Sequence, residues 1–393
     1  MGNKVVVLGG GIGGVVAATE LRRRLGRDHR VVLVDRMRKQ AFPPSFLWVM
    51  SGAREPARIV RDLGRIRQQG VEFMEAEVQG ISVESREVRT SGGPVAYDTL
   101  VLGLGAELDL GAMPGLAAAG HTFYTLEGAS ALRDRLAAFA GGRIAVVVSR
   151  LPFKCPAAPY EAALLIEAAM RRRGLRDRVE IDLFTPEKLP MPVAGPAVGA
   201  AVARLLKARG IGFHPEHLLD GVDAARRLLS LQGGAEAGFD LLAFVPPHRA
   251  PACVREAGLL NDAGWVPVNP NTMATKHEGV FAIGDIASIK LESGLVLPKA
   301  GVFAHSQAKV VARNIAARFD GRPESARFDG RGGCWLEAGD GKAAFAKGNF
   351  YASPAPAVAM RKPSAGRHLT KVLFERYWFL RWFKRTRVDP VSR

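Results

Sequence analysis

Short apolar runs and stretches with a helical period alternate along most of the chain. Residues 4–8 are a valine-rich run typical of a buried strand, residues 15–25 have helical spacing, and residues 31–34 are a second valine-rich run. The apolar stretch that begins at residue 142 leads through a loop into a helical run at residues 160–173. Strands that alternate with helices indicate parallel sheets, so the pattern predicts an α/β protein with two Rossmann-like nucleotide-binding units.

The turn after the first strand has the composition of a phosphate-binding loop. Gly9, Gly11 and Gly14 supply the spacing that allows a tight turn and a close approach of the backbone to a pyrophosphate. Asp35 ends the second strand about 20 residues past the last glycine, where an acidic side chain can accept ribose hydroxyls. The order of these residues predicts a dinucleotide site, although it does not separate FAD from NAD.

Two later segments favour FAD. One apolar strand precedes small residues up to Gly105, and another ends in Gly284-Asp285. Both are similar to motifs of the FAD-dependent pyridine nucleotide-disulfide oxidoreductases. This resemblance implies that Asp285 binds the flavin ribityl chain, with a helix-capping role as the alternative. Lys299 and Val302 lie where the same superfamily starts a helix that faces the isoalloxazine ring, and a cation there stabilises reduced flavin. A solvated surface lysine is the alternative for Lys299.

The second strand-loop-helix unit carries a cysteine where a nicotinamide-binding loop is expected. Its loop contains Cys155 but no G-x-G-x-x-G, which favours two-electron chemistry through sulfur over hydride transfer from NAD(P)H. The helix that follows and the adjacent Lys154 are expected to stabilise a Cys155 thiolate. Each cysteine alone is more often a small buried hydrophobe. The missing loop nevertheless favours interpreting Cys155 and Cys334 as a redox pair.

The chain resembles the sulfide:quinone oxidoreductase and flavocytochrome c sulfide dehydrogenase group over nearly its whole length. The features that carry the resemblance are Cys155 followed by Pro-Tyr-Glu161, Cys334, the Phe-Pro-Pro-Ser-Phe-Leu-Trp segment at 42–48, the Pro-Pro loop at 246–247 and the Phe-Glu-Arg-Tyr-Trp segment at 374–378. The resemblance implies a redox centre of Cys155 and Cys334 beside the flavin, with their order open, and a proton relay at Glu161. A solvent-facing Glu161 is the alternative.

Several positions depart from that group. The cysteine that attaches flavin covalently in the cytochrome-linked enzymes should lie near residues 42–48, where none occurs, so non-covalent FAD is expected. The third redox cysteine of many sulfide:quinone oxidoreductases is absent from residues 121–128, and Cys253 falls in a different segment, where a structural role is expected. No zinc-type spacing of cysteine and histidine occurs, so no metal site is expected.

The chain of 393 residues is long enough for two or three domains. The motifs assign residues 1–105 and 263–320 to an FAD-binding domain and residues 106–262 to a second Rossmann-like domain without the NAD fingerprint. Residues 321–393 form a C-terminal region with redox and membrane-contact roles. The predicted architecture is therefore glutathione reductase-like, followed by an amphipathic helix.

The net charge of +17 requires an anionic partner or surface. No nucleic-acid motif occurs, so nucleic acid is not expected as a partner. Cations and aromatics coincide at residues 369–384, which hold two of the five tryptophans, and such a helix suits the headgroup boundary of an anionic membrane. The cations assigned to this surface are Lys371, Arg376, Arg381, Lys384, Arg385 and Arg387. A helix packed on the body or on a dimer partner is the alternative.

The same features predict a location and a function. No secretory signal precedes the first strand and no apolar run of about 18 residues occurs, which predicts a peripheral membrane protein, cytoplasmic, or periplasmic if a signal was trimmed. The leading function is FAD-dependent oxidation of sulfide to zero-valent sulfur or polysulfide, with electrons passed to membrane quinone. Transfer to a c-type cytochrome, an NADH:quinone reaction and a non-enzymatic flavin-bearing module are the alternatives. Homo-oligomerisation stays open.

Overall fold

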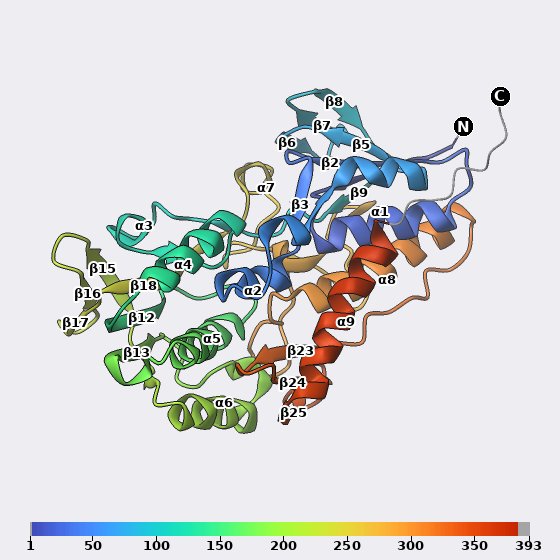
Figure 1. Ribbon diagram of the computed structural model, residues 1–393. Coiled ribbons are helices and arrows are strands. Elements are labelled where there is room, and N and C mark those ends of the chain that lie inside the picture. The colour runs from blue at the N-terminus through green and yellow to red at the C-terminus, as the bar shows by residue number, and fades with distance from the viewer. Residues whose placement is uncertain (1, 384–393) are drawn as a thin grey trace, which may run out of the picture.

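The structure is a computed structural model that describes residues 2–383 (Figure 1). The first of its two five-stranded parallel sheets has the strand order β21-β9-β1-β2-β5. Its strands are β1 (Lys4–Leu8), β2 (Arg30–Asp35), β5 (Glu72–Glu75), β9 (Thr99–Leu102) and β21 (Val280–Ala282). The Gly284-Asp285 motif follows β21, so the sheet brings it to the same edge as the glycine loop that follows β1.

Both faces of this sheet are buried, as the continuous apolar runs of β1 and β2 predict. Alternate residues of β1 belong to two separate apolar cores, one shared with α1 and α8 and the other with a three-stranded meander and α7. These elements are α1 (Ile12–Arg24), α8 (Gly301–Phe319), β6 (Val78–Ser82), β7 (Glu87–Thr90), β8 (Gly93–Ala96) and α7 (Ala252–Glu256). The period of two along each strand thus separates the two layers.

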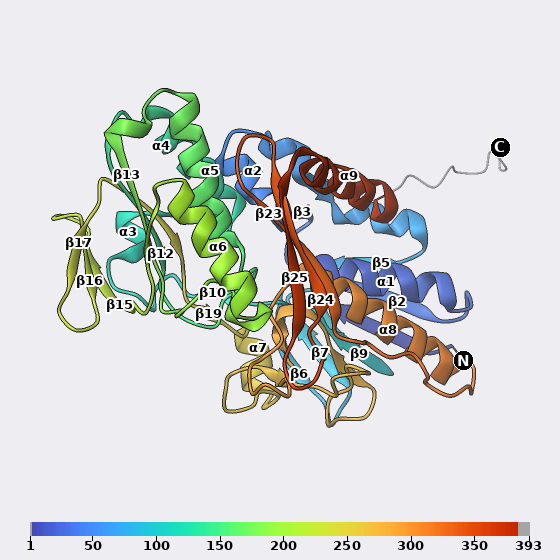
Figure 2. The ribbon, with the colours of Figure 1, turned by 90° about the horizontal axis from the view of Figure 1, so that it is seen from below.

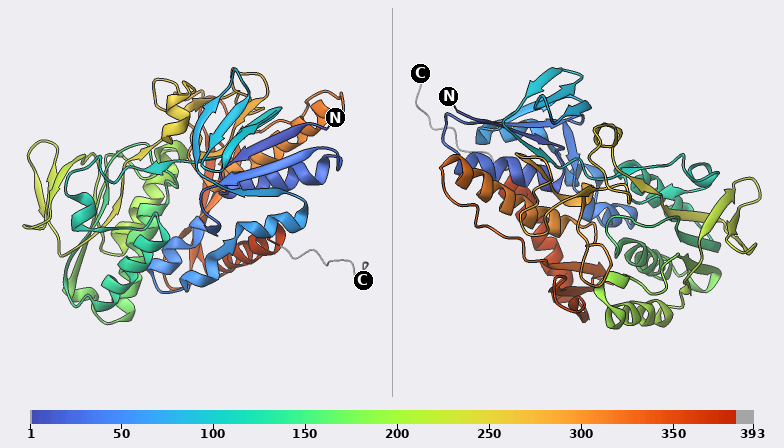
Figure 3. Two further views of the ribbon diagram at one scale, coloured as in Figure 1. Left: turned by 90° about the horizontal axis from the view of Figure 1, so that it is seen from above. Right: turned by 180° about the vertical axis from the view of Figure 1, so that it is seen from behind.

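The second parallel sheet has the order β11-β18-β12-β13-β14. Its strands are β11 (His121–Thr122), β12 (Gly142–Val148), β13 (Val179–Phe184), β14 (Gly212–His214) and β18 (Leu241–Val245). One face packs on helices and the other on a small antiparallel sheet. The covering elements are α4 (Leu126–Ala138), α5 (Ala158–Arg172), α6 (Pro196–Ala208), α3 (Leu116–Ala119), β15 (Leu219–Asp223), β16 (Leu228–Leu231) and β17 (Glu236–Gly238). Two such units at opposite ends of the molecule confirm the predicted fold class (Figure 3).

The remaining strands and α2 are short. They are β3 (Lys39–Ala41), β4 (Val60–Asp62), β10 (Glu107–Leu108), β19 (His248–Arg249), β20 (Val266–Pro267), β22 (Ala287–Ser288) and α2 (Phe46–Met50). The 3-10 turns are η1 (Pro43–Ser45), η2 (Pro56–Ile59), η3 (Leu63–Gln69), η4 (Arg176–Arg178), η5 (Pro192–Ala194) and η6 (Gly284–Ile286).

The C-terminal region adds an antiparallel sheet and one long helix. The sheet consists of β23 (Arg331–Glu337), β24 (Ala343–Asn349) and β25 (Ala357–Ser364), and α9 (Ala365–Trp382) follows it. Figure 2 shows this sheet between the two parallel-sheet units, and β23 contacts both α5 and α8. Cys334, which lies on β23, is therefore carried to the junction of the two units.

The position of α9 corrects one expectation from the sequence. Trp378 and Trp382 are 1% and 0% exposed, and Trp378 stacks on Phe42 at 5.3 Å between ring centroids. Lys371 is also buried, and Arg381 makes a 3.0 Å ion pair on the protein body. The prediction that these tryptophans and Lys371 face a membrane is wrong, because their helical spacing directs them inward, while Arg381 is partly exposed. Lys384, Arg385 and Arg387 lie outside the described residues.

The outer side of α9 is apolar instead. Leu369, Leu373, Tyr377 and Leu380 are 55%, 51%, 51% and 63% exposed, and their spacing places them along one side of the helix. Within residues 2–383, no helix is both long enough and apolar enough to cross a bilayer.

Candidate active site

The segment from the end of β1 into the first turn of α1 requires glycine at two positions for steric reasons. Gly9 has φ +95°, and a Cβ on it would lie 2.4 Å from the carbonyl oxygen of Gly103. A Cβ on Gly14 would lie 1.7 Å from the carbonyl oxygen of Gly9. Gly11 is the N-cap of α1 without a side-chain cap, and no described atom lies within 4 Å of a Cβ placed on it. This open position and the uncapped N–H groups of the first helical turn fit a pyrophosphate.

Asp35 ends β2 beside this loop. Its carboxylate accepts backbone N–H bonds from Gly10 at 2.5 Å and Met37 at 2.7 Å. Burial raises the pKa of Asp35, and these two hydrogen bonds oppose the increase. The side chain is therefore held next to the glycine loop, and its contact with a ribose stays a prediction.

Lys299 is the main cation at the predicted flavin-facing helix. The side chain is 5% exposed, and its Nζ donates to the backbone oxygen of Asp285 at 2.5 Å. The same Nζ lies 3.4 Å from the ring centroid of Trp265. Burial lowers the pKa of Lys299 to about 8, while Asp285 opposes this shift. A solvated surface lysine is thereby excluded. Next to it, α8 begins without a side-chain cap at Ala300.

The other predicted flavin contacts lie in open or strained backbone nearby. Gly105 follows β9 with φ +69°, and no described atom lies within 4 Å of a Cβ placed on it, while Gly284 has φ +73°. Val302 lies in the first turn of α8. Burial raises the pKa of Asp285, while Lys154 opposes this shift together with the lysine described above. The open glycine loop, the two uncapped helices and the buried cation fit FAD, and these residues would hold it.

The structure brings the two predicted redox cysteines together. Cys155 lies between β12 and α5 with φ +54°, and its N–H donates to the carbonyl oxygen of Lys299 at 2.7 Å. Cys334 lies on β23 opposite Ala346 of β24. Both are free and partly exposed, and their thiols lie within hydrogen-bonding reach of each other. The backbone bond to Lys299 links the cysteine loop directly to the predicted flavin-facing helix.

The two thiols shift each other's pKa in opposite directions. The hydrogen bond to Cys334 and then burial raise the pKa of the Cys155 thiol, whereas the same hydrogen bond lowers the pKa of Cys334. The expectation of a Cys155 thiolate held by Lys154 is therefore wrong for the reduced pair. The Nζ of Lys154 instead lies 3.5 Å from the carbonyl oxygen of Ala106, and the cation that lowers the pKa of both thiols is Lys371.

A buried ion-pair cluster lies beside the cysteines. Glu161 on α5 is 3% exposed and accepts a hydrogen bond from Lys371 on α9. The Nζ of Lys371 also lies 3.8 Å from Glu337 and 4.8 Å from the ring centroid of Trp48. His368 contacts Glu337 through Nδ1 at 2.9 Å. The solvent-facing alternative for Glu161 is excluded.

Glu161 has the properties of a proton relay. Burial raises its pKa to about 7, with Lys371 lowering and Glu337 raising it. Burial disfavours the charged form of Lys371, but Glu161 and Glu337 together keep its pKa above the ordinary value. A carboxyl group that titrates near neutral pH can both accept and release a proton.

Reasoning from the sequence missed Lys371, Glu337 and His368 as members of the site. The helical spacing of Lys371 with Trp378 and Trp382 would have placed that lysine on the buried side of its helix. Glu337 carried no comparable signal, because it lies at the end of a strand whose partners are set by the tertiary fold.

Cys253 lies apart from this cluster. It is 7% exposed on α7, in the core on the other face of the first sheet, and burial raises the pKa of its thiol to about 11. Such a thiol stays protonated at neutral pH and packs as a small hydrophobe.

The fold and site define a flavin-type oxidoreductase with two dinucleotide-binding-like units and a cysteine pair where the second glycine loop would be. A family model described as pyridine nucleotide-disulphide oxidoreductase matches residues 3–308, and the chain belongs to this family. Membership of this family implies a flavin cofactor.

The relatives confirm the resemblance inferred from the sequence. The mitochondrial sulfide:quinone oxidoreductase of Mus musculus is 27% identical over 300 residues, which cover 73% of this chain and 66% of the mouse protein. The sulfide-quinone reductase of Aquifex aeolicus is 26% identical over 396 residues, which cover 96% of this chain and 90% of the relative. The solved structure of the Aquifex aeolicus sulfide:quinone oxidoreductase superposes with a TM-score of 0.88 at 24% identity and covers 98% of this chain and 92% of its own.

Proposed function

We propose that the chain oxidises sulfide with FAD as the first electron acceptor and a membrane quinone as the second. The observation that carries the proposal is that the fold brings Cys155 and Cys334 close enough for their thiols to shift each other's pKa, while the Cys155 N–H binds the carbonyl oxygen of Lys299. Relatives whose names describe sulfide:quinone oxidoreductases support the substrates. We further infer that FAD binds without a covalent bond, because residues 42–48 offer no cysteine.

The reaction begins from a disulfide between the two cysteines. Hydrosulfide attacks one sulfur, so a new S–S bond forms a persulfide while the Cys155–Cys334 bond breaks and the other cysteine leaves as a thiolate. A second hydrosulfide removes the outer persulfide sulfur as a hydrogen disulfide anion and returns the first cysteine as a thiol after protonation. Closing the disulfide again releases two electrons and one proton. FAD, when bound, supplies the two-electron acceptor, and quinone receives the electrons afterwards.

The two cysteines share the attacked and leaving roles in this scheme: hydrosulfide attacks one sulfur of the Cys155–Cys334 disulfide, and the other cysteine leaves as the thiolate. Glu161, with its pKa near 7, takes up the proton that is released when the disulfide closes, and Lys371 holds its carboxylate in place.

The donor is tested by mixing the purified holoprotein with sulfide or with NADH without oxygen and recording the flavin absorbance. We expect sulfide to bleach the flavin and added quinone to restore the absorbance, whereas NADH leaves it unchanged. Bleaching by NADH and not by sulfide would overturn the proposal in favour of an NADH:quinone reaction. Cys253→Ser is the matched control, because this cysteine lies in a separate core.

A further inference from the structure

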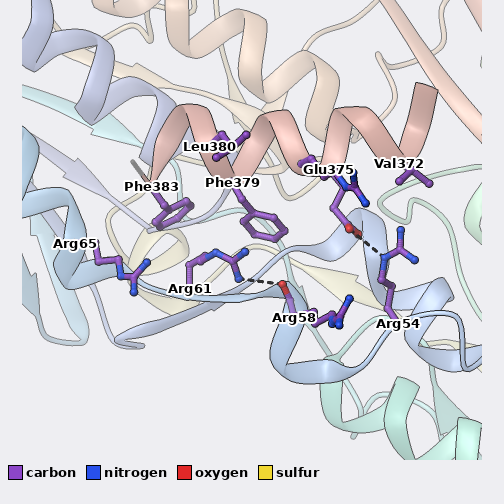
Figure 4. A pocket seen from close by; sticks show the side chains of 10 residues that line it. Arg54, Arg58, Arg61, Arg65, Val372, Glu375, Phe379, Leu380 and Phe383 are labelled. Carbon is purple, nitrogen blue, oxygen red and sulfur yellow. Dashed lines mark hydrogen bonds and ion pairs between the residues drawn. The ribbon is translucent and has the colours of Figure 1, made fainter. Parts of the chain in front are cut away.

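A basic groove lies between α9 and the segment that contains η2, β4 and η3. Its volume is about 690 Å³, and apolar side chains of α9 form its other wall (Figure 4). The charged groups among its described lining residues are five arginines and one glutamate: Arg54, Arg58, Arg61, Arg65, Arg376 and Glu375. The size is that of a site for a small molecule or a lipid headgroup.

The carboxylate of the groove is already neutralised. Glu375 is 8% exposed and accepts hydrogen bonds from Arg54 Nε at 3.1 Å and from the hydroxyl of Ser45 at 2.5 Å. Figure 4 shows the pair of Glu375 and Arg54 at one end of the groove. The remaining arginines therefore face a cavity whose glutamate is already bonded to Arg54 and Ser45.

The remaining arginines carry charge that is not paired within the described chain. Among residues 2–383, Arg58, Arg65 and Arg376 make no ion pair within 4 Å. Arg61 donates to two backbone carbonyl oxygens, and its guanidinium carbon lies 3.8 Å from the ring centroid of Phe379. Burial and then the neighbouring Arg65 lower the pKa of Arg61. The groove thus holds an excess of positive charge, with five arginines and one glutamate among its described lining residues.

The exposed apolar side of α9 adjoins this charge. Leu380 lines the groove and is 63% exposed, and Leu373 and Tyr377 continue the apolar side along the helix at 51% each. A free phosphate compound would satisfy the arginines but leave these side chains in water. A phospholipid would satisfy both, because its phosphate is anionic and its acyl chains are apolar.

We propose that the groove binds the phosphate of one anionic phospholipid while the acyl chains cover the exposed side of α9. Arginine forks bind phosphate oxygens through two parallel N–H bonds, which makes them suited to this headgroup. The inference deepens the membrane contact that the proposed quinone reaction implies. Vesicle binding tests it without sulfide or quinone, so its failure and the failure of the proposed activity are distinguishable.

The experiment measures binding of the holoprotein to vesicles of phosphatidylcholine alone or mixed with phosphatidylglycerol. Wild type should prefer the anionic vesicles. The double variant Arg58→Gln/Arg65→Gln should bind them about 30-fold more weakly, which is about fivefold for each arginine at an anionic surface. Neither side chain makes a hydrogen bond or ion pair within the described residues, so folding should be unchanged.

Arg172→Gln/Arg204→Gln is the matched control. Both of these arginines are exposed on α5 and α6, outside the groove, so their loss lowers the net charge equally and should leave binding nearly unchanged. Leu373→Ser/Leu380→Ser should weaken binding to both kinds of vesicle. Equal losses in the groove and control variants would overturn the proposal in favour of diffuse charge. Binding of inorganic phosphate without any vesicle preference would overturn it in favour of a free-phosphate site.

Discussion

Replacing Lys371 by methionine removes the buried cation that lies between two buried carboxylates. Lys371, Glu161 and Glu337 are 6%, 3% and 1% exposed, so water cannot replace the lost charge. Removing one partner of a buried ion pair costs about 3–5 kcal/mol, because it leaves an uncompensated charge in the interior. Loss of the cation also raises the pKa of Glu161, and proton uptake there limits the cost. We expect a loss of about 3 kcal/mol in unfolding free energy at about pH 8.

Urea unfolding of the holoprotein measures this loss through the transition midpoint. The double variant Lys371→Met/Glu161→Gln removes both charges together. Its loss should be smaller than the sum of the two single losses by about 2 kcal/mol, because residues in direct contact are coupled. Arg172→Gln combined with Lys371→Met serves as the uncoupled pair. If the losses in unfolding free energy for Lys371→Met and Glu161→Gln add up in the double variant, the two side chains do not stabilise each other in the interior and the argument is refuted.

Two further predictions concern the flavin loop and the buried carboxyl group. Gly14→Ala places a Cβ 1.7 Å from the Gly9 carbonyl oxygen, so the purified variant should lose bound FAD while keeping its circular dichroism spectrum. Gly366→Ala is the control and should retain FAD, because no described atom lies within 4 Å of a Cβ placed there. Normal FAD content in Gly14→Ala would contradict the loop assignment. Glu161 has a pKa of about 7, above its ordinary value of 4.5, so its contribution to stability is present at low pH and is lost as the pH rises through 7. Wild type should therefore lose roughly 3 kcal/mol relative to Glu161→Gln between about pH 5 and about pH 8 in urea unfolding, and parallel pH profiles would count against this.

The sequence predicted the parts of the site that depend on local order along the chain. Gly9, Gly11 and Gly14 lie in a turn whose geometry is dictated by neighbours in sequence and by one crossing strand, so a spacing motif describes it well. The α/β class followed from apolar runs that are buried on both faces of a parallel sheet, which leaves a clear signal in the sequence.

The sequence could not predict which charged groups would meet in the interior. Helical spacing could have placed Lys371 on the buried side of its helix, but the carboxylates that it meets there depend on how the helix docks, and its docking contacts, such as Trp378 on Phe42, join residues far apart in the chain. The pKa of Cys155 was mispredicted for the same reason, since it is raised by the hydrogen bond to Cys334 and by burial, and Cys334 meets Cys155 only through the tertiary fold. Which charged side chains lie next to one another depends on tertiary packing, and local sequence patterns do not predict that packing.

The roles of Cys155 and Cys334 are the central claim, and anaerobic rapid mixing with sulfide tests them most directly. Wild type and Cys253→Ser should show the same rate of flavin bleaching. Cys155→Ser and Cys334→Ser should each keep bound FAD but lose sulfide-driven bleaching, because neither can form the disulfide that hydrosulfide opens. Bleaching at the wild-type rate in either variant would remove that cysteine from the reaction and contradict the proposed redox pair.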